Sequence, residues 1–344
     1  MSNTLEVKWA GWDAHERKNS LTAGIGIDHH TSASAAYVGK TGASKTTGSR
    51  VYPSLSWDIE NEKKGTDFGL GAYYSTEYNY KSLGLDVSFS KKTHGNGELS
   101  TRVTSYFDQV KLIYPSEFRT TTTTTTTTNT GASSSGSSYS NESQNAPSTP
   151  RKTITGSLTL SQVINQRLQA SIMVDGVYQN GYLGLPFHRV YFNDGSDHIE
   201  NLPSERKKLP IGLRINYFLS DNIVLRSYYR YYTDDWGITA HTASLEIPVK
   251  ISPFFSISPF YRYYVQTAAR YFAPYEVHTA KDVYYTSNYS LSAFNSQFMG
   301  AGLRIAPPNG VLHTHLNTLE IRYGHYTQTT SLVSDVLSVN LKFK

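Results

Sequence analysis

The chain has 344 residues, of which 17% are charged and 27 are tyrosines, and its formal net charge is +5. An average soluble domain is about 25% charged, so this composition is poor in charge and rich in amphipathic aromatic side chains. The absence of cysteine excludes disulfides, thiolate nucleophiles and Cys-based zinc or iron–sulfur sites. The basic residues are dispersed along the chain without a dense Lys/Arg block, and nucleic acid is therefore not an expected partner.

The N-terminal segment from Met1 to Trp12 is polar and lacks the apolar stretch of a signal peptide. No run of about 18 apolar residues occurs elsewhere, so the sequence predicts no transmembrane helix. An exported chain of this kind is expected to be a mature form whose leader has been removed.

The clearest signal in the sequence is alternation of apolar and polar residues with a period of two, which is typical of β-strands. It is strict over residues 209–219, 318–326 and 337–343. We predict strands over residues 4–11, 18–30, 49–60, 65–78, 81–92, 97–113, 152–164, 167–181, 208–219, 222–234, 237–250, 254–268, 295–306, 316–328 and 334–343. Soluble strands average about five to six residues, whereas a strand that crosses a bilayer at a tilt needs about 9–11.

The connections alternate between tight turns and long loops, which is the pattern of bacterial outer-membrane barrels. The long ones cover residues 31–48, 114–151, 182–207 and 269–294. The sequence therefore predicts an all-β fold: a transmembrane antiparallel up-and-down β-barrel of about 14–16 strands with long extracellular loops, in one domain over residues 1–344. A soluble β-sheet is the competing interpretation. A bilayer excludes open sheet edges, so the strands are expected to close.

The candidate strands number fifteen, whereas single-chain bacterial barrels have an even count. Either residues 4–11 are not a barrel strand, which leaves 14, or one more strand precedes them, which gives 16. Within the loop of residues 114–151, nine consecutive threonines are followed mostly by Ser, Gly and Asn, and we expect this low-complexity extracellular loop to be disordered. A band of tyrosines is predicted to form a girdle at headgroup level: Tyr228, Tyr229, Tyr231, Tyr232, Tyr261, Tyr263 and Tyr264.

Several longer motifs resemble a family of bacterial outer-membrane proteins known as domain of unknown function 3570. They are "SQVINQRLQAS" at 161–171, "FHRVYF" at 187–192, "LPSERKKLPIGLRINYFLSDN" at 202–222, "YYRYYTDDW" at 228–236 and "YYTSNYSLSAFNSQ" at 284–297. The resemblance implies a single barrel in the outer membrane of a Gram-negative bacterium. Members are often encoded beside a flavin transferase, a thioredoxin-like protein and a small lipoprotein, which hints at envelope redox biology. Members also commonly carry a further N-terminal hairpin segment, and this supports 16 strands.

If the apolar parity faces lipid, the other parity lines a lumen. The predicted lumen-lining residues are Arg102, Arg214, Arg226, Arg230, Glu246, Arg262, Arg304, Glu320 and Arg322. Further inward charges expected by the same rule are Arg167, Lys342, Asp86, Asp108 and Asp175. The inner wall is thus predicted to be net positive. A charged side chain on the lipid face destabilises a barrel by roughly 2–4 kcal/mol at the midplane of the bilayer. The restriction of charged residues to one of the two alternating sets of strand positions therefore supports the barrel.

Two interpretations of this arginine-rich wall remain open. In the first interpretation, the wall forms a narrow ring that selects anionic solutes, as rings of Arg or Lys do in anion pores. Alternatively, it is a network of ion pairs that fills and braces the lumen, with Arg226 expected to pair with Glu246 and Arg304 with Glu320 across the ladder.

Two of the long loops are too aromatic to be plain solvated linkers, and we expect them to form a plug or a docking surface. The residues concerned are Phe187, His188, Arg189, Tyr191, Phe192, Tyr271, Phe272 and Tyr275, with Tyr284 and Tyr285 alongside.

Other candidate sites are weaker. His29 with His30, and His313 with His315, lack an acidic ligand at close spacing, so no metal is expected. His241 and Ser244 differ in parity and cannot form a catalytic dyad. Asp234 and Asp235 are residues that favour a tight turn, and the turn accounts for them without a bound calcium ion. We expect no catalytic residues, no cofactor and no enzymatic activity.

Two functions are therefore expected from the sequence. The first is a porin-like channel or transport-related protein for small, anionic solutes. The second is a non-conducting barrel that docks envelope partners, such as a lipoprotein or other outer-membrane proteins, in a membrane protein complex. Outer-membrane lipid is a partner in both.

Overall fold

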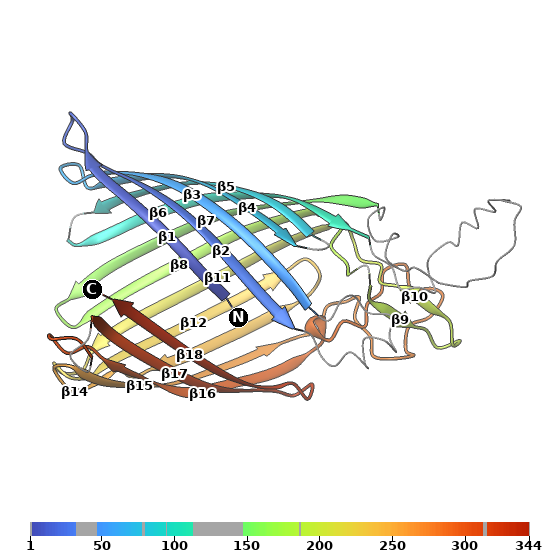
Figure 1. Ribbon diagram of the computed structural model, residues 1–344. Helices are drawn as coiled ribbons and strands as arrows, with labels where there is room; N and C mark the ends of the chain where they lie inside the picture. The colour runs from blue at the N-terminus through green and yellow to red at the C-terminus, as the bar shows by residue number, and fades with distance from the viewer. Residues whose placement is uncertain are drawn as a thin grey trace, which may run out of the picture.

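The computed structural model describes residues 2–31, 47–77, 80–93, 95–112, 147–185, 187–311 and 315–343. The chain forms one 16-stranded antiparallel sheet whose strand order follows the chain order (Figure 1). The predicted low-complexity loop lies largely outside the described residues. Among the described residues, no helix is long and apolar enough to span a membrane.

The strands of the sheet are long. They are β1 (Ser2–Trp12), β2 (Lys18–Thr31), β3 (Thr47–Asn61), β4 (Thr66–Glu77), β5 (Tyr80–Thr93), β6 (Gly97–Lys111), β7 (Ser148–Asn165), β8 (Leu168–Gly181), β11 (Glu205–Phe218), β12 (Val224–Asp234), β13 (Thr239–Glu246), β14 (Val249–Ser252), β15 (Phe255–Gln266), β16 (Phe294–Ile305), β17 (Leu316–Gln328) and β18 (Val333–Phe343). A two-stranded sheet of β9 (Arg189–Tyr191) and β10 (Asp197–Ile199) and a 3-10 turn η3 (Tyr289–Leu291) lie in the loops. The all-β, antiparallel barrel prediction is confirmed.

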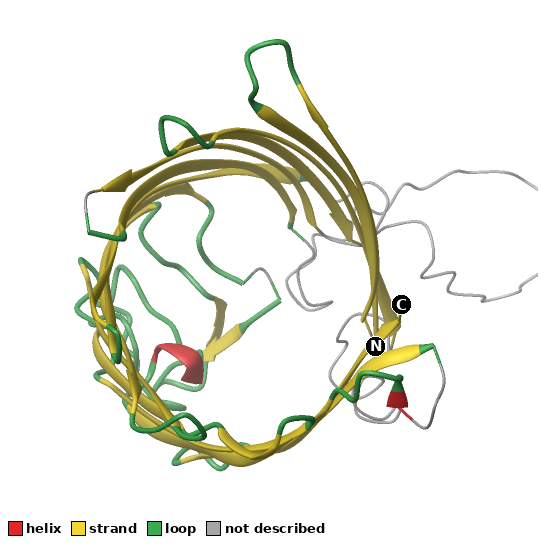
Figure 2. Ribbon diagram, turned by 90° about the vertical axis from the view of Figure 1, so that its left-hand side faces the viewer, coloured by secondary structure: helices red, strands yellow, loops and turns green. Residues whose placement is uncertain are grey.

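Every predicted strand corresponds to a strand of this sheet, and the predicted strand 237–250 is divided into β13 and β14, which both pair with β15. Residues 4–11 belong to β1, which pairs with β2 along its whole length, so the 14-strand alternative is wrong. The sheet curls around a lumen, with β1 and β18 as its edges (Figure 2). Contrary to the expected closure, no described ladder joins these two edges, which run in the same direction along the wall (Figure 1).

The wall has the inside-out polarity of a membrane barrel. On β11, Leu209, Ile211 and Leu213 are 43%, 38% and 39% exposed, whereas the intervening Pro210 and Gly212 are buried. In a soluble sheet the large apolar side chains would be the buried set. The same parity rule corrects the predicted tyrosine girdle: Tyr229, Tyr261 and Tyr263 share the lipid-facing parity, but Tyr228, Tyr232 and Tyr264 face the lumen.

Tight turns join the strands at the end opposite the long loops, and the β1–β2 turn shows what holds one of them. The Asp13 carboxylate accepts hydrogen bonds from the backbone N–H groups of His15 and Arg17, each at 2.9 Å, and from Arg17 Nε at 2.8 Å. These bonds to the charged form, led by the Arg17 backbone N–H, lower the pKa of Asp13 to about 2. The Asp13 carboxylate of this turn therefore stays charged to a lower pH than an ordinary aspartate.

Candidate functional site

The predicted lumen residues lie on the concave face of the wall. Along each strand they alternate with the exposed apolar side chains, which face the other way. Most of them gather on β11 to β17, which we call the basic wall. Within it the ladder places Arg214, Tyr228, Ser244, Arg262 and Phe298 in one row across five strands. Arginines and aromatic rings thus alternate along this side of the lumen.

Glycines lie beside two aromatic rings of the basic wall. A Cβ placed on Gly324 would collide with the ring of Phe298, and one placed on Gly300 would lie 2.8 Å from Phe260 Cζ. Glycine removes this conflict, and each ring covers backbone that would otherwise be exposed.

The two ion pairs predicted for this wall, Arg226 with Glu246 and Arg304 with Glu320, are not formed. Arg226 and Glu246 are opposite each other in the ladder, as predicted, but Glu246 Oε1 instead accepts a hydrogen bond at 3.0 Å from Arg322 Nη1. Arg304 and Glu320 are also opposite each other and form no ion pair. Arg322 reaches Glu246 by lying 4.3 Å above the ring of Phe260, over a stretch of wall where the neighbouring strands carry glycine.

Several arginines of the basic wall therefore have no carboxylate partner among the described residues. They are Arg214, Arg226, Arg230, Arg262 and Arg304. All five are exposed on the lumen face, and two of them contact aromatic faces: Arg214 lies over Tyr228 at 5.8 Å and Arg262 over Phe298 at 5.3 Å. The interpretation of this wall as a filled ion-pair network is thus not supported for these residues.

The opposite wall is not basic, and the prediction of a net positive inner wall is wrong for β3 to β6. There Asp58, Glu60, Asp67 and Glu98 line a cavity of about 510 Å³ together with Lys92 and Arg102. We call the four acids the acidic patch. None of the four was among the residues predicted to face inward, although alternation with the exposed Leu55, Trp57, Phe68 and Leu99 places all of them inside. Arg102 is 3.8 Å from Asp86.

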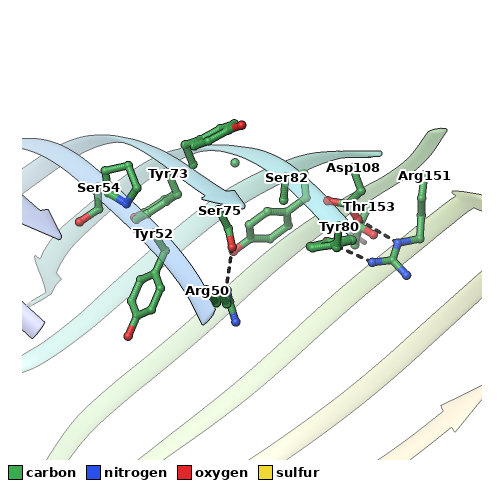
Figure 3. Close-up of a pocket in the computed structure, with 14 residues that line it drawn as sticks. Arg50, Tyr52, Ser54, Tyr73, Ser75, Tyr80, Ser82, Asp108, Arg151 and Thr153 are labelled. Carbon is green, nitrogen blue, oxygen red and sulfur yellow. Dashed lines mark hydrogen bonds and ion pairs between the residues drawn. The ribbon is translucent and has the colours of Figure 1, made fainter. Parts of the chain in front are cut away.

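Nearer the long loops, β3 to β7 form a second cavity of about 380 Å³ on the inner wall (Figure 3). Its polar lining includes Arg50, Asp108 and Arg151, and its aromatic lining includes Tyr52, Tyr73, Tyr80 and Tyr106. Arg151 donates to Asp108 Oδ2 at 2.8 Å and to the Tyr80 hydroxyl at 3.1 Å. Of these residues, the sequence placed only Asp108 on the inner wall. Alternation with the lipid-facing Leu55 and Leu83 would also have placed Arg50, Tyr52 and Tyr80 there.

The two aromatic loops fold against each other at the outer mouth into what we call the loop layer, residues 182–204 and 267–293. Bridges join Phe192 to His278 and Asn201 to Tyr285. Val190, Phe192, His278 and Thr286 are at most 5% exposed and form its core. Seen along the barrel, its hairpin and 3-10 turn lie within the outline of the wall (Figure 2).

The predicted plug or docking residues divide between this core and the surface. Phe192 is buried at 3% exposure and packs on His198 and Tyr285, whereas Phe187 and Tyr275 are 46% and 58% exposed. The remainder are intermediate in exposure: His188, Arg189, Tyr191, Tyr271 and Phe272. Phe192 thus stabilises the layer, whereas Phe187 and Tyr275 present large exposed rings, as do Tyr284 and Tyr289 at 43% and 51% exposure.

Glu200 is the polar centre of the loop layer. Its carboxylate is 4% exposed and accepts hydrogen bonds from the Thr286 hydroxyl and the Leu185 backbone N–H, both at 2.5 Å. Burial in the layer raises the pKa of this carboxyl above its ordinary value, against the lowering effect of the two hydrogen bonds. Protonation of Glu200 is therefore coupled to the packing of the layer.

The remaining sequence candidates have structural partners. His241 lies on the lipid-facing parity, with Nδ1 at 2.7 Å from the Tyr229 hydroxyl, while Ser244 faces the lumen. The Asp234 carboxylate accepts from Arg206 and Tyr232 and from the Ile238 backbone N–H, so this turn uses both oxygens. Within the described ranges, no three His, Cys, Asp or Glu side chains cluster as a metal site. His313 and the side chain of His30 lie outside the described residues.

The model of one protein family, described as "Protein of unknown function (DUF3570)", matches residues 29–333. The chain belongs to this family. No curated protein matches it. The family's printed description assigns no activity, so membership identifies relatives without identifying chemistry.

Solved structures show the same architecture. The ferric enterobactin receptor PfeA of Pseudomonas aeruginosa, in a double mutant, superposes with a TM-score of 0.51 at 11% identity, covering 95% of this chain and 51% of the receptor. The siderophore receptor PirA of Acinetobacter baumannii gives 0.51 at 10% identity, covering 99% and 55%. The chain thus spans about half the length of these receptors. At this identity the likeness concerns the fold, and the DUF3570 chain is an outer-membrane β-barrel.

Proposed function

We propose that this DUF3570 barrel is a conduit through the outer membrane for small anionic solutes. The observation that carries the proposal is a set of exposed arginines on the basic wall that have no carboxylate partner in the described part of the chain, including Arg214, Arg226, Arg262 and Arg304. Unpaired guanidinium groups attract anions and make a wall selective for them. In this proposal the chain is not an enzyme, and the solute crosses unchanged.

The position of these arginines favours guidance along the lumen over a single tight site. Arg214 and Arg262 share one ladder row, Arg230 lies one row nearer the loop end and Arg226 one row nearer the turn end. Neighbouring lumen residues along a strand are about 7 Å apart, which is within the Debye length of about 8 Å at physiological ionic strength. An anion can therefore pass from one guanidinium to the next without leaving an attractive field.

Planar lipid bilayers test the proposal. The folded protein is expected to give stepwise currents, and the reversal potential under a KCl gradient is expected to shift toward the cation-selective side in an R226Q/R262Q variant. The matched control is R167Q. Contrary to the prediction that it faces inward from a strand, Arg167 is exposed in the β7–β8 turn, outside the basic wall. A correctly folded protein that gives no current contradicts the proposal.

A second function is supported by the surface of the loop layer. Tyr275, Val277 and Val283 are 58%, 55% and 71% exposed in one short segment. Exposed apolar patches mark interaction sites. We propose as the alternative a scaffold that docks an envelope lipoprotein or another outer-membrane protein there. Co-purification that survives detergent and is lost in a V277D/V283D variant would support it; co-purification of the variant with the same partners would count against it.

A further inference from the structure

The cavity on β3 to β7 contains a guanidinium group that has no carboxylate partner among the described residues. Arg50 is exposed, and its Nε donates to Ser75 Oγ at 2.8 Å (Figure 3). Within the described part of the chain, neither terminal nitrogen has a hydrogen-bond partner. Asp28 is opposite Arg50 in the ladder, but its carboxylate accepts the Tyr52 hydroxyl at 3.0 Å and forms no ion pair with Arg50. The two terminal nitrogens of the planar Arg50 guanidinium match the two oxygens of a carboxylate in shape and charge.

The second arginine of the cavity is already neutralised. Arg151 is bonded to Asp108, whose side chain is 2% exposed, and to the Tyr80 hydroxyl. The charged side chains that line the cavity are thus, among the described residues, one bonded Arg–Asp pair and one arginine without a carboxylate partner. This balance suits a ligand that carries a single negative charge.

Flat aromatic surfaces surround this charge. A Cβ on Gly26 would collide with the ring of Tyr52, and one on Gly84 would lie 2.7 Å from the ring of Tyr106, so both rings lie against bare backbone. Arg50 itself is 5.1 Å from the centre of the Tyr52 ring. An aromatic ring prefers offset or edge-to-face contact with such surfaces, which contribute about 0.5–1.5 kcal/mol per pair beyond area burial.

We infer that this cavity is a binding site for a small aromatic carboxylate, with the carboxylate on Arg50 and the ring among Tyr52, Tyr80 and Tyr106. The inference rests on the proposed conduit function and names the class of anion that it carries. The basic wall supports it independently, since Arg214 on Tyr228, Arg262 on Phe298 and Arg322 on Phe260 repeat the same combination of guanidinium and ring across the lumen.

Isothermal titration of the detergent-folded full chain tests the site directly, with benzoate as the probe. Acetate removes the ring, benzyl alcohol removes the charge, and maltose offers hydroxyl groups in place of both. Benzoate is expected to bind saturably and at least tenfold more tightly than each of the other three. Equal binding of acetate, or preferential binding of maltose, overturns the proposal.

Variants separate the two parts of the site. R50Q is expected to weaken benzoate binding about 10- to 100-fold, the effect of losing a charge-assisted hydrogen bond. R50K keeps the charge but loses the fork, and is expected to fall in between. R167Q is the matched control and is expected to bind as the parent does. Unchanged binding in R50Q, with the barrel shown to be folded by its heat-modifiable mobility, overturns the proposal.

Conductance distinguishes failure of the site from failure of the proposed function. Benzoate is expected to reduce the single-channel KCl current of the parent protein and not that of R50Q. Currents that benzoate does not affect leave the conduit standing and contradict the site. Saturable benzoate binding by a protein that conducts no ions leaves the site standing and contradicts the conduit.

Discussion

Glu246 bonds to Arg322, which lies beyond two intervening strands, although Arg226 is its direct neighbour in the ladder. Loss of this bond is expected to destabilise the barrel measurably: R322M should lower the free energy of unfolding by about 1 kcal/mol, since both side chains are partly exposed and screened. R226M is the matched control and is expected to change stability by less than about 0.5 kcal/mol. Urea unfolding in lipid vesicles measures both. A larger effect of R226M would contradict the assigned pairing.

The glycine beside Phe298 provides the second prediction. G324V forces a side chain into the space of the Phe298 ring, so we expect a loss of about 1–3 kcal/mol in unfolding free energy, as for other overpacked sites. The displaced ring should also narrow the lumen and lower the single-channel current.

G156V is the control for this substitution, because nothing lies within 4 Å of a Cβ at Gly156. The residue shares its parity with the exposed Leu158 and Leu160, which face lipid. Stability and current are expected to stay near the parent values. Equal losses in G156V and G324V would show that the backbone, and not the Phe298 ring, sets the requirement for glycine.

The raised pKa of Glu200 predicts how the loop layer responds to pH. A carboxyl whose pKa is higher in the folded layer than in the unfolded chain binds more protons when folded. Its contribution to stability is therefore fully present below the ordinary carboxyl pKa and is lost as the pH rises through the folded value.

Hydrogen exchange of the layer, corrected for the intrinsic dependence of exchange on pH, measures this effect. Protection of the buried backbone around Val190 and Thr286 is expected to decrease as the pH rises through that window. An E200Q variant cannot titrate and should show a flat profile. A parent profile that is already flat would mean that the hydrogen bonds from Leu185 and Thr286 offset the cost of burying the charge.

Local sequence patterns predicted the architecture because lipid-facing apolar residues and lumen-facing polar residues alternate along a membrane strand. Leu209, Ile211 and Leu213 identify the lipid face of β11 and thereby place Arg214 in the lumen. The same rule could not predict that Glu246 binds Arg322. That partner depends on glycines in β16 and β17, which open a path across Phe260 and become adjacent only when the strands pair.

The candidate sites were harder to predict for a related reason. The cavity around Arg50 takes residues from β3, β4, β5, β6 and β7, and none of the contributing segments has a distinctive motif. The loop layer was recognised as aromatic, but composition does not distinguish the buried Phe192 from the exposed Tyr275. That difference arises from a bridge between Phe192 and His278, which are far apart in the sequence.

The acidic patch gives the last prediction. Asp58 and Asp67 line the cavity of the acidic patch. Their strands, β3 and β4, lie across the barrel from the basic wall (Figure 1), so these carboxylates oppose the anion selectivity that the arginines are proposed to impose. Neutralising them in a D58N/D67N variant is expected to shift the reversal potential further toward anion selectivity, in the direction opposite to the shift of R226Q/R262Q. Screening should shrink both shifts at 1 M salt, where the Debye length is about 3 Å. D221N, in the exposed β11–β12 turn, is the control. If D58N/D67N and D221N behave alike, the permeating ions follow the basic wall and do not approach the acidic patch.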